Sequence, residues 1–228
     1  LALAQTHHFT SRGIVDGYVF PEQIYDIMAA GKQNKIAVML GFNADEGTVL
    51  GAYSRVPKDT KSYEAQIHAL FGDTAEAYLK LYPSSDLTKS TLESFRDSFV
   101  TWSMQSWAML TAKVKQPAYL YYFSHRPPGP AQEQLGAYHA AEIRYVFNNI
   151  TESTADMALA DVMSNYWVAF AKTGSPNVQG QPQWQPYVKN KRHYMEFNQE
   201  TKTGAVPGID LLPGVWEFWE TWNARHRP

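Results

Sequence analysis

Cysteine is absent from this sequence of 228 residues, and its absence excludes several kinds of chemistry. The chain can form no disulfide, offers no thiolate nucleophile and cannot build a cysteine-ligated metal site. The absence fits a reducing cytoplasm, so we expect a cytoplasmic protein. Secretion stays open as the alternative, because secreted bacterial proteins often lack cysteine too.

Three further features are missing from the sequence. No run of about 18 apolar residues occurs, the length that suggests a membrane-spanning helix, so we predict no membrane span. No basic run accompanies the net charge of -2, so nothing indicates a nucleic-acid partner. No His-x-x-x-His or Glu-x-x-His pattern occurs, so we predict no metal site and no cofactor.

What the sequence does have is the composition of a globular protein with a large core. Hydrophobic residues make up 44% and charged residues 18%, which argues against a disordered chain. Apolar runs of strand length alternate with helical patterns. We expect strands over residues 36–42, 118–123 and 193–197, and helices over about 21–30, 61–81, 92–115, 154–172 and 215–224.

This alternation predicts an α/β fold with a mostly parallel sheet flanked by helices. Only three strands are expected, and a sheet that small, covered by this many helices, would not close its own core. An inner strand left at the edge would also invite pairing with another chain. We therefore expect part of the fold to lie elsewhere.

Two loops at the ends of expected strands carry groups suited to acid–base catalysis. Asp45 and Glu46 follow the first strand, and His139 follows the second. Loops at the carboxyl ends of parallel strands are where ligand-binding and catalytic groups collect. An imidazole that acts as a general base needs a carboxylate to hold its protonated nitrogen and to stabilise the imidazolium. On this chemistry alone, either Asp45 or Glu46 could be the partner of His139.

The residues around these groups resemble two signatures of one family. Residues 40–48 read Leu-Gly-Phe-Asn-Ala-Asp-Glu-Gly-Thr, with the pattern Gly-x-Asn-x-Asp-Glu-Gly, and residues 136–147 place Gly-x-x-His before Glu and an aromatic-Val-Phe run. These are similar to the signatures around the triad acid and histidine of type-B carboxylesterases, the α/β-hydrolases that include para-nitrobenzyl esterases and cholinesterases. Further matches follow in family order at residues 15–17, 166–174 and 184–187.

The resemblance implies a role for each of these groups. Glu46 is expected to be the triad acid, because the motif favours it over Asp45, and His139 the general base. Glu142 lies three residues after His139 and on a helix would share a face with it, and we expect a supporting carboxylate in a buried polar network. Residues 1–228 are expected to be the C-terminal portion of a single α/β-hydrolase domain that hydrolyses carboxylic esters without a cofactor.

The nucleophile that this chemistry needs is missing from the sequence. A nucleophile elbow reads Gly-x-Ser-x-Gly, and no serine of this chain fits it; no His-Gly-Gly oxyanion loop occurs either. In the family both features lie in the N-terminal half. We therefore predict a partner chain that carries the serine and the oxyanion hole, with a small-molecule ester as substrate.

A second function fits the same resemblance. Some members of the superfamily have lost the nucleophile, so the alternative is a non-catalytic, esterase-like binding or adhesion protein. The presence of both Glu46 and His139 argues against that alternative. The lack of cysteine departs from the secreted animal members, which use disulfides, and so favours a bacterial-type esterase.

Overall fold

The computed structural model describes residues 14–129, 132–151, 153–199 and 203–226. The chain divides into two compact units, residues 1–35 and residues 36–228. Each unit is described by itself below, and the strands and their covering helices all belong to the second.

The first unit contains a turn and one short helix. Oδ1 of Asp16 accepts hydrogen bonds from three successive backbone N–H groups, the last of them that of Phe20. Helix α2 then spans Ile24–Ala29. The sequence predicts a helix that starts at Pro21, but the backbone of Gln23 is still extended, with φ -59° and ψ 137°, so the helix begins later.

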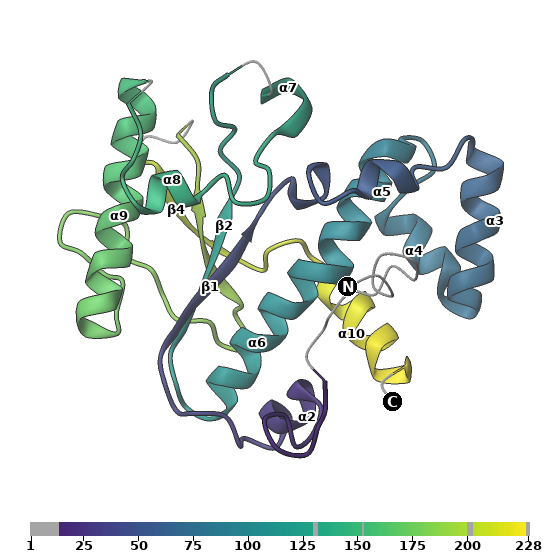
Figure 1. The fold of residues 1–228 in the computed structure, drawn as a ribbon, viewed down its shortest axis with the longest axis horizontal. Helices are drawn as coiled ribbons and strands as arrows, with labels where there is room; N and C mark the ends of the chain where they lie inside the picture. Colours follow the sequence, from purple (N-terminus) through teal and green to yellow (C-terminus); the bar gives the residue numbers. More distant parts are fainter. Residues whose placement is uncertain (1–13, 130–131, 152, 200–202, 227–228) are drawn as a thin grey trace, which may run out of the picture. The chain divides into compact units, whose positions relative to one another are not determined.

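The second unit is built on a four-stranded sheet in the order β1-β2-β3-β4 (Figure 1). Strands β1 (Val38–Asn43), β2 (Ala118–Phe123) and β3 (His193–Phe197) are parallel and confirm the three predicted strands. Strand β4 (Ala205–Ile209), antiparallel to β3, was not predicted. It contains Pro207, which argues against a strand in sequence but is tolerated at a sheet edge, where β4 lies in the described part of the chain.

Helices cover both faces of this sheet, with α9 (Thr154–Thr173) on one side and α6 (Trp102–Lys113) on the other (Figure 1). Because successive side chains of a strand point to opposite faces, the parallel strands β1, β2 and β3 contribute to two separate cores. The core toward α9 includes Tyr119, Phe123, Met163, Tyr166, Trp184, Met195 and Phe197. The core toward α6 includes Leu40, Phe42, Ala108, Ala118, Leu120 and Tyr187.

A long helical segment separates β1 from β2. Its parts are 3₁₀ turns at Glu46–Thr48, Ala52–Arg55 and Gly72–Thr74, helices α3 (Thr60–Phe71), α4 (Ala75–Leu81) and α5 (Leu87–Arg96), a π-helical turn at Asp97–Thr101, and α6. The single helix predicted over residues 61–81 is interrupted because Gly72 adopts a positive φ of 51°. The helix predicted from residue 92 begins at Leu87, where the side chain of Asp86 caps it.

The remaining helices follow β2. They are α7 (Gln132–Leu135), α8 (Ile143–Val146), α9 and α10 (Val215–His226). The helices predicted over residues 154–172 and 215–224 are confirmed as α9 and α10. Helix α10 packs on α3 and α4 through a third apolar cluster, which includes Phe71, Tyr78 and Trp219. In the described residues, no helix combines the length and the apolarity that crossing a bilayer requires.

Candidate active site

Glu46 lies in the turn that leaves β1, and both of its carboxylate oxygens are engaged. Oε1 accepts a hydrogen bond from the backbone N–H of Asn43 at 2.9 Å, and Oε2 lies 2.6 Å from Nδ1 of His139. Only 6% of the Glu46 side chain is exposed. Because little water screens this carboxylate, its interaction with the imidazole is stronger than that of an exposed pair.

His139 reaches Glu46 from the loop that follows β2. The two loops meet because β1 and β2 are parallel neighbours and leave the sheet at the same edge, and Asp45 and Tyr138 extend the pairing by one parallel bridge. The side chain of His139 is 53% exposed. With Nδ1 directed at the carboxylate, Nε2 is the nitrogen that can exchange a proton with another group.

Asp45, the other carboxylate that could be the partner of His139 on chemistry alone, has a different set of contacts. Its Oδ2 accepts a hydrogen bond from the N–H of Ala137 at 2.8 Å, and its own N–H donates to the carbonyl of Ala137 at 3.0 Å. Gly136 permits this approach, because its φ is +60° and a Cβ there would lie 2.1 Å from Oδ2 of Asp45. Asp45 thus fastens the two loops together, while Glu46 meets the imidazole.

Asn43, which the sequence reasoning missed, also joins the two loops. Its side chain is fully buried, and Nδ2 donates to the carbonyl of Tyr138 at 2.7 Å and to Oε2 of Glu142 at 2.5 Å. Its backbone N–H holds Glu46 at the same time. The signal was present, since Asn43 is the asparagine of the Gly-x-Asn-x-Asp-Glu-Gly pattern, but a motif does not reveal which distant groups its members contact.

Glu142 joins this network from an unexpected position. The prediction that it shares a helix face with His139 is wrong, because Ala140 between them has a left-handed backbone with φ +71° and α8 begins only after Glu142. Glu142 is half-buried and accepts a hydrogen bond from the Tyr121 hydroxyl at 3.4 Å. Burial, with nearby carboxylates, raises the pKa of Tyr121, so its phenol stays a neutral donor.

Comparison with known proteins decides the family. The family model described as carboxylesterase family matches residues 1–208. The chain belongs to the carboxylesterase family. The fumonisin B1 esterase of Sphingopyxis macrogoltabida is 30% identical over 213 residues, which are 86% of this chain and 38% of that protein. The medium-chain fatty acyl-CoA hydrolase precursor of Anas platyrhynchos is 26% identical over 233 residues, 90% of this chain and 41% of that protein. The chain therefore spans about two fifths of the length of these curated relatives.

Solved structures of esterases share the fold. A PNB esterase superimposes with a TM-score of 0.70 at 23% identity, covering 90% of this chain and 42% of the other. The Geobacillus stearothermophilus carboxylesterase EST55 superimposes with a TM-score of 0.74 at 21% identity, covering 96% and 47%. These likenesses confirm the predicted fold class, part of an α/β-hydrolase with a mostly parallel sheet flanked by helices.

In this carboxylesterase-family chain, a buried ion pair supports the acid turn, by which we mean residues 44–46 with their two carboxylates. Arg96, only 4% exposed, donates from Nη1 to the carbonyl of Ala44 at 2.8 Å and from Nε and Nη2 to the carboxylate of Asp97 at 2.7 and 3.1 Å. Asp97 also accepts hydrogen bonds from the hydroxyls of Tyr82 and Thr101. Since Ala44 directly precedes the two carboxylates, Arg96 fixes the backbone from which they project.

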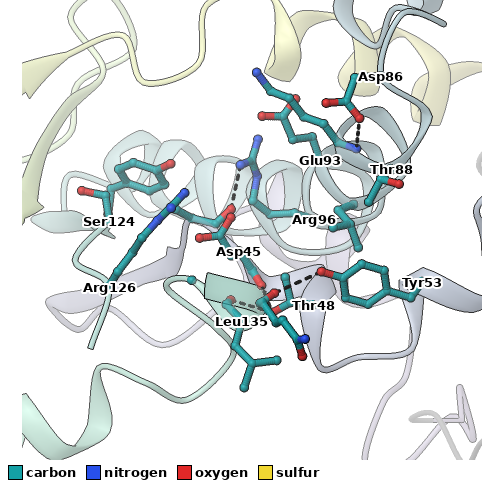
Figure 2. Close-up of a pocket in the computed structure, with 16 residues that line it drawn as sticks. Asp45, Thr48, Tyr53, Asp86, Thr88, Glu93, Arg96, Ser124, Arg126 and Leu135 are labelled. Carbon is teal, nitrogen blue, oxygen red and sulfur yellow. Dashed lines mark hydrogen bonds between the residues drawn. The ribbon is translucent and has the colours of Figure 1, made fainter. Parts of the chain in front are cut away.

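A cavity of about 610 Å³ opens beside this ion pair (Figure 2). Charged side chains of both signs line it, among them Asp45, Glu93 and Arg126. Neither Glu46 nor His139 does, so the carboxylate and its imidazole meet outside this cavity. Among the described residues, no group of three or more metal-ligating side chains is placed to hold a metal ion.

Replacing Arg96 by methionine should destabilise the protein strongly. The substitution leaves the buried Asp97 without its cation and the Ala44 carbonyl without its donor, and breaking a buried pair in this way costs about 3–5 kcal/mol. The measurement is the free energy of unfolding in urea. Arg225→Met is the matched control, because its pair with Asp73 is exposed and should contribute about 1 kcal/mol or less. Equal losses in the two variants would contradict the supporting role of Arg96.

Proposed function

We propose that this protein hydrolyses carboxylic esters through a serine–histidine–glutamate triad, with His139 as the general base and Glu46 as the acid. The observation that carries the proposal is the 2.6 Å contact between Nδ1 of His139 and Oε2 of Glu46. The carboxylate is buried, the imidazole is half exposed, and the two meet at the carboxyl ends of neighbouring parallel strands. Family membership supports the same reaction.

The geometry suits each step of an acyl transfer. A serine hydroxyl attacks the ester carbonyl while Nε2 of His139 takes its proton, and Glu46 stabilises the imidazolium that forms. The imidazolium then protonates the departing alcohol, which leaves an acyl-enzyme. Water, deprotonated by the same nitrogen, attacks the acyl group. The bond from the acyl carbon to the serine oxygen then breaks, the imidazolium returns the proton to that oxygen, and the carboxylic acid leaves. Backbone donors of an oxyanion hole stabilise the two tetrahedral intermediates.

The hydrogen bonds of Glu46 fix the tautomer and the orientation of the His139 imidazole. With its carboxylate accepting from Nδ1–H, the neutral tautomer of His139 carries its lone pair on Nε2, where a serine proton can be received. The N–H of Asn43 fixes the other carboxylate oxygen, so Glu46 cannot turn away without losing a buried hydrogen bond.

We further propose that residues 1–228 are the C-terminal portion of one esterase domain, completed by an N-terminal portion that brings the serine and the oxyanion hole. Strand β1 lies at an edge of the sheet in the described residues, with β2 on one side. The N–H groups of Val38 and Ala44 donate toward β2, so those of Met39 and Gly41 face the other edge. A further strand there would pair with them.

An apolar helix face lies next to this edge. Val100 and Met104 pack in the same core cluster as Leu40 of β1. Phe99, directly before Val100, and Trp107, about one helical turn after Met104, are 55% and 45% exposed. Large exposed side chains beside an open strand edge support a surface that the N-terminal portion covers. The sequence predicts that this portion is a separate partner chain. The alternative, an N-terminal portion joined covalently to residues 1–228, is distinguished from it by experiment.

The substrate is proposed only as a class. The relatives are named for different substrates, fumonisin B1 in one and fatty acyl-CoA in another, so their likeness to this chain does not select one compound. We propose a carboxylic ester with an aromatic or short acyl or alcohol group, attacked without a cofactor.

The test is to assay para-nitrophenyl butyrate hydrolysis with the 228-residue chain alone and with the N-terminal portion supplied, as a separate polypeptide and as a fusion. We expect no turnover from the chain alone and turnover, with an initial burst of nitrophenol, once the serine-bearing portion is present. Native mass spectrometry shows whether two polypeptides or one form the active species. A folded assembly that contains the serine and hydrolyses no ester would favour the binding or adhesion protein instead.

A further inference from the structure

A second histidine–carboxylate pair is buried near the loop that carries His139, and the proposed chemistry does not use it. His125, Tyr145 and Asp156 are each at most 2% exposed. Nε2 of His125 lies 2.7 Å from Oδ1 of Asp156 and 3.0 Å from the Tyr145 hydroxyl, which donates to the same carboxylate oxygen at 2.5 Å. Because solvent does not reach these groups, an ester cannot either, and any part they play is exerted through the structure around them.

The three residues come from segments on both sides of the His139 loop. His125 lies two residues after the end of β2, and its backbone N–H donates to the carbonyl of Phe197 in β3 at 3.2 Å. Tyr145 lies in α8, shortly after His139, and Asp156 lies in the first turn of α9. The cluster therefore ties the start of the loop to its end, and both to the sheet and α9.

A residue with a strained backbone lies between His139 and Tyr145, the member of the cluster that lies in α8. Ala140 has φ +71°, a left-handed backbone that is unfavourable for any residue with a Cβ. Overlapping turns connect it without a break to α8. Strain of this kind persists only where the surroundings hold it in place. Asn43 holds one side of the turn through the carbonyl of Tyr138, and Tyr145 holds the other side through α8.

The attachment at Asp156 is a charged one. Burial raises the pKa of Asp156, but hydrogen bonds from Tyr145, Ser153 and His125 outweigh burial and bring the pKa below its usual value. The carboxylate is therefore ionised at neutral pH. Hydrogen bonds to an ionised group are about twice as strong as neutral ones, which makes the cluster a firm anchor for α8.

We propose that a clamp of His125, Tyr145 and Asp156 holds the strained turn after His139 and thereby keeps its imidazole on Glu46. The clamp residues are positioning residues, because they act through the turn and touch neither the ester nor the nucleophile. The inference rests on the proposed function, in which His139 is the general base.

The test compares Tyr145→Phe with Tyr166→Phe in the full, assembled protein. Both tyrosines are buried in the same core cluster, and each substitution removes one hydroxyl. The hydroxyl of Tyr166 donates to the carbonyl of Pro182, outside the His139 loop. We expect Tyr145→Phe to lower kcat about tenfold with KM unchanged, since small displacements of a catalytic group have effects of this size. The control should leave kcat unchanged, and equal kcat in the two variants would overturn the clamp.

A second readout does not depend on activity. The proton between His139 and Glu46 should give a low-field NMR resonance, assigned by its loss in His139→Ala. We expect Tyr145→Phe, and likewise Asp156→Asn, to weaken or shift this resonance and Tyr166→Phe to preserve it. If the wild-type protein shows the resonance but hydrolyses no ester, the proposed function fails while the clamp is still judged by the resonance. An unchanged resonance in both Tyr145→Phe and Asp156→Asn would overturn the clamp.

The link between the clamp and the strained turn has its own test. In an Ala140→Gly background the turn is no longer strained, so the loss of kcat caused by Tyr145→Phe should become smaller. The same background should not alter the effect of Tyr166→Phe. A loss of kcat from Tyr145→Phe that is equal in both backgrounds would contradict the proposal that the clamp holds this turn.

Discussion

Replacing His139 by alanine is expected to lower kcat of the proposed assembled esterase by about 10⁴-fold or more. The substitution removes the group proposed to accept the serine proton and later to return it to the leaving alcohol, and in triad enzymes the loss of this group removes most of the catalysis. KM should change little, because the imidazole is not expected to bind the ester in the ground state. Steady-state hydrolysis of para-nitrophenyl butyrate measures both quantities.

His68→Ala is a closely matched control for this substitution. Both histidine side chains are 53% exposed, and both lie near a glutamate. The distance from Nε2 of His68 to Oε1 of Glu76 is 3.6 Å, however, and Glu76 is largely exposed, whereas Glu46 is buried. We expect no change in kcat for His68→Ala. Turnover that survives in His139→Ala at the wild-type rate would show that another group is the base.

Glu46→Gln is expected to lower kcat by about 10⁴-fold with little loss of stability. Glutamine has the same shape, and its carbonyl oxygen can still accept from the N–H of Asn43, so the acid turn should keep its conformation. Its amide nitrogen would instead donate to Nδ1 of His139. That hydrogen bond selects the tautomer with the proton on Nε2, the nitrogen proposed to accept the serine proton. The substitution also removes the charge that would stabilise the imidazolium.

Asp45→Asn tests whether Glu46, and not the neighbouring Asp45, is the acid. Asparagine at this position can still accept the hydrogen bond from the N–H of Ala137, which is the contact that Asp45 makes. We expect its kcat to fall less than tenfold, because the imidazole keeps its carboxylate partner. The two variants are compared by kcat and by thermal unfolding on the same day and in the same buffer. An effect of Asp45→Asn as large as that of Glu46→Gln would contradict the choice of Glu46 as the acid.

The sequence located the two groups of the candidate site because each lies in a contiguous motif. The Gly-x-Asn-x-Asp-Glu-Gly pattern follows an apolar run that forms β1, and the Gly-x-x-His pattern follows one that forms β2. A buried parallel strand is continuous in hydrophobicity, so its end can be recognised without knowing its partners. The meeting of Glu46 with His139 could therefore be expected from strand ends that share an edge.

Strand β4 and the helix breaks were harder to predict for a local reason. In β4, Pro207 and Gly208 carry the pattern of a turn, and only pairing with β3 makes the segment a strand. The helix expected over residues 61–81 continues its apolar pattern through Gly72, and the backbone conformation of that one residue divides it. Pattern and propensity describe averages over a window, whereas such boundaries depend on single residues.

By itself, the sequence determined the family, the fold class, three strands, the main helices and the two side chains that form the candidate pair. Only the tertiary structure decided how the carboxylates divide their contacts, with Asp45 on the Ala137 backbone and Glu46 on the imidazole. It alone revealed Asn43 between the loops, Arg96 behind the acid turn and the clamp beside His139. Each of these is a set of hydrogen bonds between separate segments of the chain, and such contacts exist only once the sheet and its flanking helices have assembled, so no local pattern of residues specifies them.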